Sequence, residues 1–293
     1  ATTLFLSDNL SVTILLTAGC SWFGGDDELD NISGEQQLYK EAQRHLKSEN
    51  YDLAIRSFQM LESRYPFGRY AEQAQLELIY AYFGAYQFEA ATEAAERFIR
   101  LHPRHPSLDY AFYMKGLSAY DLEPGLLSRF IASDNTKRDV SPIKVAFAEF
   151  SELLARFPDS TYAPDARQRM IHMRNMLARN EIHVANYYFR RGAYLAALKR
   201  GQYVVEKLQQ TPSVADGLAI MAQSYLLLGA EDLAQDSINI LCNNYPEHPN
   251  LGKDCKFKNS YTADGLERSW INEVSFGLFD PPKPPQFDYE PKL

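Results

Sequence analysis

Residues 64–71 read Arg64-Tyr65-Pro66-Phe67-Gly68-Arg69-Tyr70-Ala71, and the same outline returns at residues 104–111 and 156–163. In each copy an arginine, a planar side chain and a proline are followed by Tyr-Ala, with the tyrosine four residues after the proline. Proline blocks continuation of a helix, and the Tyr-Ala pair begins a new apolar pattern. A helix stop and a helix start that repeat at long intervals predict an all-α stack of helical hairpins. Such stacks present long curved surfaces to other proteins and rarely carry out chemistry.

Apolar residues at helical spacing precede five prolines and predict the second helix of each hairpin. An alanine lies at the same place in each of these helices: Ala54, Ala91, Ala146, Ala197 and Ala234. The predicted partner helices lie upstream, over residues 39–47, 70–83, 107–120, a segment ending at 191, and 214–228. A small alanine lets two helices approach closely, and we expect core packing of the neighbouring Phe58, Phe98 and Phe150. The pattern resembles the tetratricopeptide repeat and predicts a superhelix of about five helical hairpins.

The spacing of the five alanines is wider in the middle of the chain than at its ends, which indicates extra material there. Residues 121–142 contain Pro124-Gly125 and many polar residues, and we expect an inserted loop. No glycine or proline interrupts residues 165–191, so one long helix is predicted. The expected domains are three repeats over 34–165, the long helix with two repeats over 166–249, and an irregular extension over 250–293. The proline-rich run at 280–285 predicts an extended tail that is poorly ordered without a partner.

The N-terminal residues have the pattern of an exported lipoprotein. A short apolar run from Leu10 to Gly19 ends at Cys20, and the composition then turns acidic. The run is too short to cross a bilayer but has the length of a signal-peptide core. Ala18 and Gly19 before the cysteine resemble a bacterial lipobox, so we expect a signal peptide over 1–19, acylation of Cys20 by diacylglycerol and an N-acyl chain, and a linker over 20–33. The alternative is an ordinary N-terminal strand or helix with an incidental cysteine.

Composition argues against several classes of function. A formal charge of −8 does not suit a nucleic-acid binder. The common hydrolase, nucleotide-binding and metalloenzyme motifs do not occur, and we predict no catalytic residue, no metal site and no cofactor apart from the lipid. His102 and His105 flank Pro103 and are expected to be solvated. Cys242 and Cys255 can form a disulfide if the domain is exported; the alternative is a buried free Cys242 and an exposed Cys255.

Several segments together resemble the BamD family of outer-membrane lipoproteins. They are the lipobox, the Arg64-Tyr65-Pro66-Phe67-Gly68 junction, Leu78-Ile79-Tyr80-Ala81-Tyr82, His105-Pro106 with Asp109-Tyr110, Tyr113-Met114-Lys115-Gly116-Leu117, and the helix from Ala146 to Pro158. The resemblance covers roughly residues 20–245. It implies a periplasmic scaffold of the β-barrel assembly machinery, anchored to the outer membrane, that binds the POTRA domains of BamA, accessory lipoproteins such as BamC and BamE, and unfolded β-barrel precursors.

The resemblance also implies two sites. The first helices of a tetratricopeptide stack line its concave side, and aromatic residues on them are candidates for a groove that receives the aromatic C-terminal strand of barrel precursors: Tyr39, Tyr80, Phe83, Tyr110, Tyr113 and Tyr120. By analogy the C-terminal repeats dock BamA. The candidate residues there are Tyr187, Tyr188, Arg190 and Arg191, because tyrosine and arginine are frequent anchors of interfaces.

Two other functions compete with this one. A periplasmic tetratricopeptide lipoprotein could instead organise enzymes of cell-wall synthesis or division. An enzyme with its site in the 121–142 insert is the third hypothesis, although Lys137, Arg138 and Asp139 are explained more simply as solvated loop charges.

Overall fold

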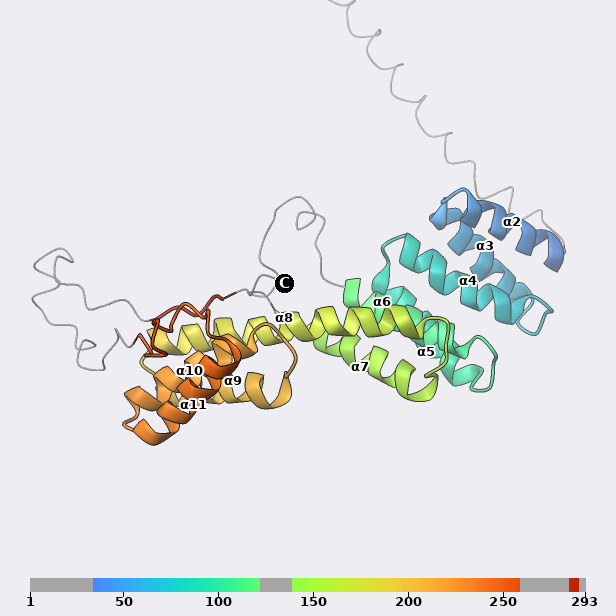
Figure 1. Cartoon of the computed structure of the whole chain (residues 1–293). Helices are drawn as coiled ribbons and strands as arrows, with labels where there is room; N and C mark the ends of the chain where they lie inside the picture. The colour runs from blue at the N-terminus through green and yellow to red at the C-terminus, as the bar shows by residue number, and fades with distance from the viewer. Residues whose placement is uncertain (1–33, 122–138, 259–284, 290–293) are drawn as a thin grey trace, which may run out of the picture. The chain divides into compact units, whose positions relative to one another are not determined.

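The computed structural model describes residues 34–121, 139–258 and 285–289, which form ten α-helices (Figure 1). They are α2 (Glu35–Lys47), α3 (Tyr51–Arg64), α4 (Ala71–Gly84), α5 (Phe88–Leu101), α6 (Leu108–Asp121), α7 (Ser141–Arg156), α8 (Ala163–Arg190), α9 (Tyr194–Lys207), α10 (Val214–Leu227) and α11 (Glu231–Asn244). The all-α prediction is confirmed. The predicted signal peptide, Cys20 and its linker, and most of the predicted insert lie outside the described residues.

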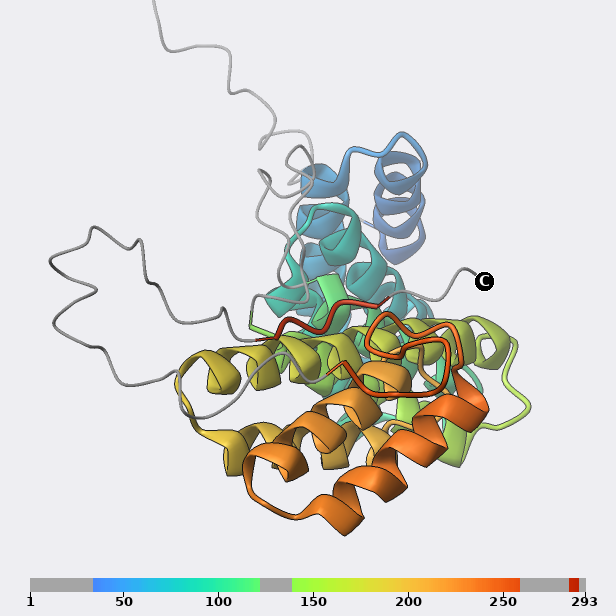
Figure 2. The same cartoon turned by 60° about the vertical axis from the view of Figure 1, so that its left-hand side comes forward.

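The chain divides into two compact units, Ala1–Met114 and Lys115–Leu293. In the first unit α2, α3, α4 and α5 pack in the order of the sequence. In the second unit α7 packs on α8, and α8, α9, α10 and α11 follow one another in the same way (Figure 2). Consecutive antiparallel pairs of this kind are the helical hairpins that the sequence predicted.

In four of the hairpins the two helices are joined by a three-residue turn of constant geometry. Its central residue has a positive φ of 57° at Glu49, 59° at Tyr86, 69° at Gly192 and 75° at Gly229. The residue after it donates a backbone hydrogen bond to the carbonyl five residues earlier, as in Asn50 to His45 and Ala193 to Tyr188. This is the Schellman ending of a helix, which satisfies carbonyl groups that the helix leaves free.

Three of the junctions between hairpins share one hydrogen-bond pattern. In the first, the Gly68 amide donates to the Tyr65 carbonyl at 3.0 Å and the Ala71 amide donates to the Gly68 carbonyl at 3.2 Å. The same two bonds recur at 157–163 and 102–108, and again at 245–251. The last copy, Tyr245-Pro246-Glu247-His248, is therefore a fourth junction, although no helix follows it directly.

The core of each unit consists of the residues that the periodicity selected. All five hairpin alanines are fully buried. The side chains of Phe58, Phe98 and Phe150 are at most 1% exposed. Close approach of helices also depends on glycine, because a Cβ added at Gly201 of α9 would meet the Gly217 carbonyl oxygen of α10 at 2.8 Å. The prediction that the alanines and phenylalanines form the hairpin core is confirmed.

Helix boundaries differ from the predictions by a few residues. The long helix is α8, which begins at Ala163 because Pro164 is tolerated in the first turn of a helix. The predicted insert is too long at its end, since α7 already begins at Ser141. Asp139 stabilises that start: its carboxylate accepts hydrogen bonds from the Ser141 hydroxyl and backbone amide, which lower its pKa. None of the described helices is both long and apolar enough to span a membrane.

Candidate interaction surfaces

The predicted docking residues come together at the C-terminal end of α8. Tyr187 is 45% exposed, and the guanidinium groups of Arg190 and Arg191 lie 6.0 and 5.4 Å from its ring centre. The Tyr187 and Tyr188 rings are 5.8 Å apart, edge to face. Arg200 of α9 lies over the Tyr188 ring at 6.0 Å. The result is an exposed patch in which cations cover aromatic faces, a combination that is frequent at the centre of interfaces.

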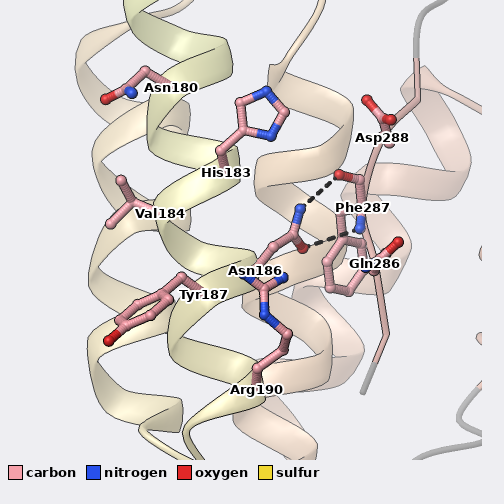
Figure 3. Close-up of a pocket in the computed structure, with 9 residues that line it drawn as sticks. All are labelled: Asn180, His183, Val184, Asn186, Tyr187, Arg190, Gln286, Phe287 and Asp288. Carbon is pink, nitrogen blue, oxygen red and sulfur yellow. Dashed lines mark hydrogen bonds between the residues drawn. The ribbon is translucent and has the colours of Figure 1, made fainter. Parts of the chain in front are cut away.

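The same helix segment also holds part of the C-terminal tail. Asn186 is 7% exposed, and its side-chain amide donates to the Phe287 carbonyl at 2.9 Å and accepts from the Phe287 amide at 3.1 Å (Figure 3). The Phe287 ring is 1% exposed and packs on Phe189 with ring centres 5.6 Å apart. The expectation of a poorly ordered tail is therefore wrong for residues 285–289, because Asn186 and Phe189 of α8 hold this segment.

A buried carboxylate continues this site onto α10. Asp216 is fully buried and accepts hydrogen bonds from Arg179 at 2.9 Å and from the Tyr289 backbone amide at 2.9 Å, while His248 Nε2 lies 3.2 Å away. Arg179 also pairs with the exposed Asp288 at 2.9 Å. Asp216 thus joins α8, α10, the fourth junction and the tail, and its charge is balanced within the cluster.

The aromatic residues predicted for the substrate groove divide into buried and open ones. Tyr39 is 9% exposed, stacks on Tyr70 at 4.6 Å and donates to the Glu77 carboxylate at 2.7 Å. Burial and the hydrogen bond to that carboxylate both raise the pKa of its hydroxyl. The prediction of Tyr39 as an open contact is corrected: the residue belongs to the core of the first hairpins.

Open aromatic rings gather instead where α4 meets the starts of α3 and α5. Tyr80 is 43% exposed and meets the Tyr51 ring edge to face at 6.3 Å, and Phe83 meets Phe88 at 5.4 Å. Tyr86, in the turn, is 61% exposed and packs its ring on Phe88 at 6.0 Å. We call Tyr51, Tyr80, Phe83, Tyr86 and Phe88 the aromatic surface of the first unit. It contains two of the predicted groove residues.

The remaining groove candidates are partly buried. Tyr110 and Tyr113 belong to the first unit and Tyr120 to the second. Burial raises the pKa of the Tyr120 hydroxyl, and the charge of Asp121 adds to this effect.

Other residues weighed from the sequence have structural partners. His102 and His105 are not solvated as expected: both pack on the Phe98 ring and lie 3.4 and 3.6 Å from the Glu72 carboxylate. Cys242 and Cys255 form a disulfide, with Cα atoms 5.7 Å apart, around the fourth junction. Among the described residues no group of three histidine, cysteine or acidic side chains could hold a metal ion.

The contact of Asn186 and Asp216 with the tail around Phe287 was not predicted from the sequence. A signal for the tail site was present, because Tyr245-Pro246 repeats the junction motif and Gln286-Phe287-Asp288-Tyr289 alternates polar and aromatic residues. This alternation is typical of an extended segment with one buried face.

Most of the chain is similar to known outer-membrane lipoproteins. A family model described as "YfiO: Outer membrane lipoprotein" matches residues 33–241. The outer membrane protein assembly factor BamD of Neisseria meningitidis serogroup A is 40% identical over 240 residues, which cover 81% of this chain and 90% of that protein. The BamD of Vibrio cholerae is 38% identical over 227 residues, with 78% and 92% coverage, and that of Xylella fastidiosa strain Temecula1 is 35% identical, with 82% coverage of each chain. The chain therefore belongs to this family of outer-membrane lipoproteins, whose members include the assembly factor BamD.

Proposed function

We propose that this chain is the scaffold and substrate-recognition lipoprotein of the outer-membrane β-barrel assembly complex. Acylated Cys20 anchors it at the periplasmic face, where it assists the folding and insertion of β-barrel proteins. Membership in the lipoprotein family supports this role, and stacked helical hairpins supply the binding surfaces that it requires. Its partners are components of the assembly complex: the POTRA domains of BamA, with BamC and BamE where the organism has them.

The docking patch at the end of α8 is the observation that carries the proposal. The Tyr187 ring already contacts Arg190 and Arg191 within the chain, so less conformational freedom is lost when a partner covers it. Both arginines are exposed and present donors on a surface that is otherwise aromatic. This chemistry suits a partner surface that carries carboxylates beside apolar groups, which we assign to the POTRA domains of BamA.

The test is copurification of BamA with the tagged full chain from detergent-solubilised outer membrane. The variant Arg190→Glu/Arg191→Glu reverses two charges of the patch and should reduce the BamA yield about tenfold or more. Lys199→Glu/Lys207→Glu is the matched control, because it makes the same charge change at exposed positions of α9. Equal BamA yields from both variants would remove the assignment of the patch.

The same experiment distinguishes a role in β-barrel assembly from a role as a cell-wall scaffold. BamA in the wild-type eluate supports the β-barrel assembly complex. A peptidoglycan synthase in the eluate without BamA would support the alternative of a cell-wall scaffold and overturn the proposal.

The substrate half of the proposal rests on the aromatic surface of the first unit. Its exposed tyrosines offer flat apolar area with polar tips and few rotatable bonds, which suits an extended aromatic segment. A photo-crosslinker at Tyr80 should capture a peptide that has the aromatic C-terminal sequence of a barrel protein, whereas one at the exposed Leu101 of α5 should not. Equal capture from both positions would contradict the proposal.

A further inference from the structure

Residues 285–289 of the C-terminal tail lie on α8 and α10 of the second unit in the way that an extended peptide binds to a protein surface. Residues 285–289 are extended, with Phe287 buried while Gln286 and Asp288 on either side are exposed. One face of the segment thus points into the unit and the other into solvent, as in a strand that lies on a surface. The helices of the second unit pack on one another in sequence order, and the Phe287 ring joins the core that they form.

The receptor side recognises the backbone as well as the side chains. Asn186 contacts both the amide and the carbonyl of Phe287, a pair of bonds that any residue in the same extended conformation can make (Figure 3). The Tyr289 amide donates to Asp216, two residues further along. Bonds to backbone groups at alternate residues supply affinity for an extended chain, and pockets for the side chains supply specificity.

Two side-chain features define what the site prefers. The Phe287 ring fills a closed apolar position against Phe189, and Arg179 pairs with Asp288 on the solvent side. The ring of Tyr289 meets that of His248 edge to face at 4.9 Å. The preferred ligand is therefore an extended segment of the form aromatic, acidic, aromatic.

Space beside the tail remains open. A groove of about 440 Å³ borders Gln286–Asp288 and is lined on α8 by Asn180, His183, Asn186 and Arg190 (Figure 3). A ligand longer than the resident segment could use this groove, whose polar and cationic lining suits backbone carbonyls and carboxylates.

We propose that α8 and α10 form a binding site for extended aromatic–acidic–aromatic peptide segments, and that residues 286–289 of this chain occupy it as an exchangeable internal ligand. Attachment to the same chain gives the tail an effective concentration on the order of millimolar. The tail therefore masks the site from weak ligands, and a partner segment of the same chemistry gains access when the tail is displaced. This inference does not depend on the partners assigned above.

The test uses the full chain and a fluorescent synthetic peptide that has the sequence of residues 282–293. The variant Phe287→Ala removes the anchor of the internal ligand and should raise the apparent affinity for the added peptide about tenfold or more in fluorescence anisotropy, because loss of a buried aromatic ring weakens the tail by roughly a hundredfold. A peptide N-methylated at the position of Phe287 cannot donate to Asn186 and is the matched control; it should bind at least tenfold more weakly.

Hydrogen exchange of the unmodified chain gives an independent readout. Excess peptide should accelerate exchange of the chain's own Phe287 and Tyr289 amides. These two amides donate hydrogen bonds to Asn186 and Asp216, and displacement of the tail exposes them to solvent. No binding to the Phe287→Ala chain at millimolar peptide, together with unchanged exchange in the unmodified chain, would show that the tail is a permanent part of the fold. Equal binding of the normal and N-methylated peptides would place the peptide elsewhere. Either outcome overturns the proposal.

Discussion

Replacement of Asp216 by alanine tests whether the buried carboxylate holds the second unit together. Asp216 is fully buried and compensates Arg179, while His248 and the Tyr289 amide also use its oxygens. Removal of one partner from a buried, hydrogen-bonded ion pair costs about 3–5 kcal/mol, because the remaining charge and polar groups lose their compensation. At 1.36 kcal/mol per factor of ten, this corresponds to amide exchange that is roughly 10²- to 10⁴-fold faster wherever opening of the unit limits exchange.

The assay is hydrogen exchange with mass spectrometry on the full chain, followed for peptides from α8, α10 and the fourth junction. Global unfolding is less informative, because a chain of two units need not unfold in a single step. Asp236→Ala on the exposed face of α11 is the matched control and should change exchange less than threefold, about 0.5 kcal/mol. If Asp216→Ala accelerated exchange less than tenfold, or no more than the control, the reasoning that this cluster stabilises the unit would be refuted.

Two further predictions concern stability away from the docking surfaces. Tyr39→Phe keeps the stacked ring but removes the bond to Glu77, and should lower the free energy of opening of the first unit by about 1.5–3 kcal/mol, measured by hydrogen exchange of peptides from α2 and α4; unchanged exchange would contradict this. Because the folded-state pKa of Tyr39 is raised above 10.0, its stabilising contribution is present at neutral pH and is lost as the pH rises above about 10, a loss that Tyr39→Phe should abolish. Cys242→Ser/Cys255→Ser opens a loop of 13-residue separation and should cost about 2–3 kcal/mol, with faster exchange at residues 245–258. Mass analysis with and without reductant verifies the pairing first, and a reduced wild-type chain with equally slow exchange would contradict the prediction.

The helices were predictable because their signals are local. The signals are the prolines at the junctions, the alanines at the hairpin centres and the 3.6-residue periodicity, and each acts within one or two helical turns. The observed helix boundaries differ from the predicted ones by a few residues. Even the long α8 followed from the absence of a helix breaker between 165 and 191. The start of α7 was misplaced because Pro142 was read as part of a loop, although proline is also common in the first turn of a helix.

The site residues were only partly predictable. The clustering of Tyr187, Tyr188, Arg190 and Arg191 could be predicted, since they are neighbours in sequence and one helix end brings them together; their docking role is a proposal. Tyr39 and Tyr80 looked alike, as tyrosines on first helices of hairpins, yet one is buried and the other is open. What separates them is the neighbouring helix: Tyr70 and Glu77 cover Tyr39, and this pairing depends on how α2 packs on its neighbours.

The amino-acid sequence alone determined the class of fold, the number and order of the helices within the described residues, the composition of the hairpin cores and the resemblance to outer-membrane lipoproteins. Each of these depends on residues that act on their near neighbours along the chain. Tertiary structure decided which aromatic rings stay open, how Asp216 is compensated and where Phe287 is buried. Those outcomes depend on groups from helices, a junction and a tail that are far apart in sequence, and the free energy of burial or pairing is available only once packing has brought them together.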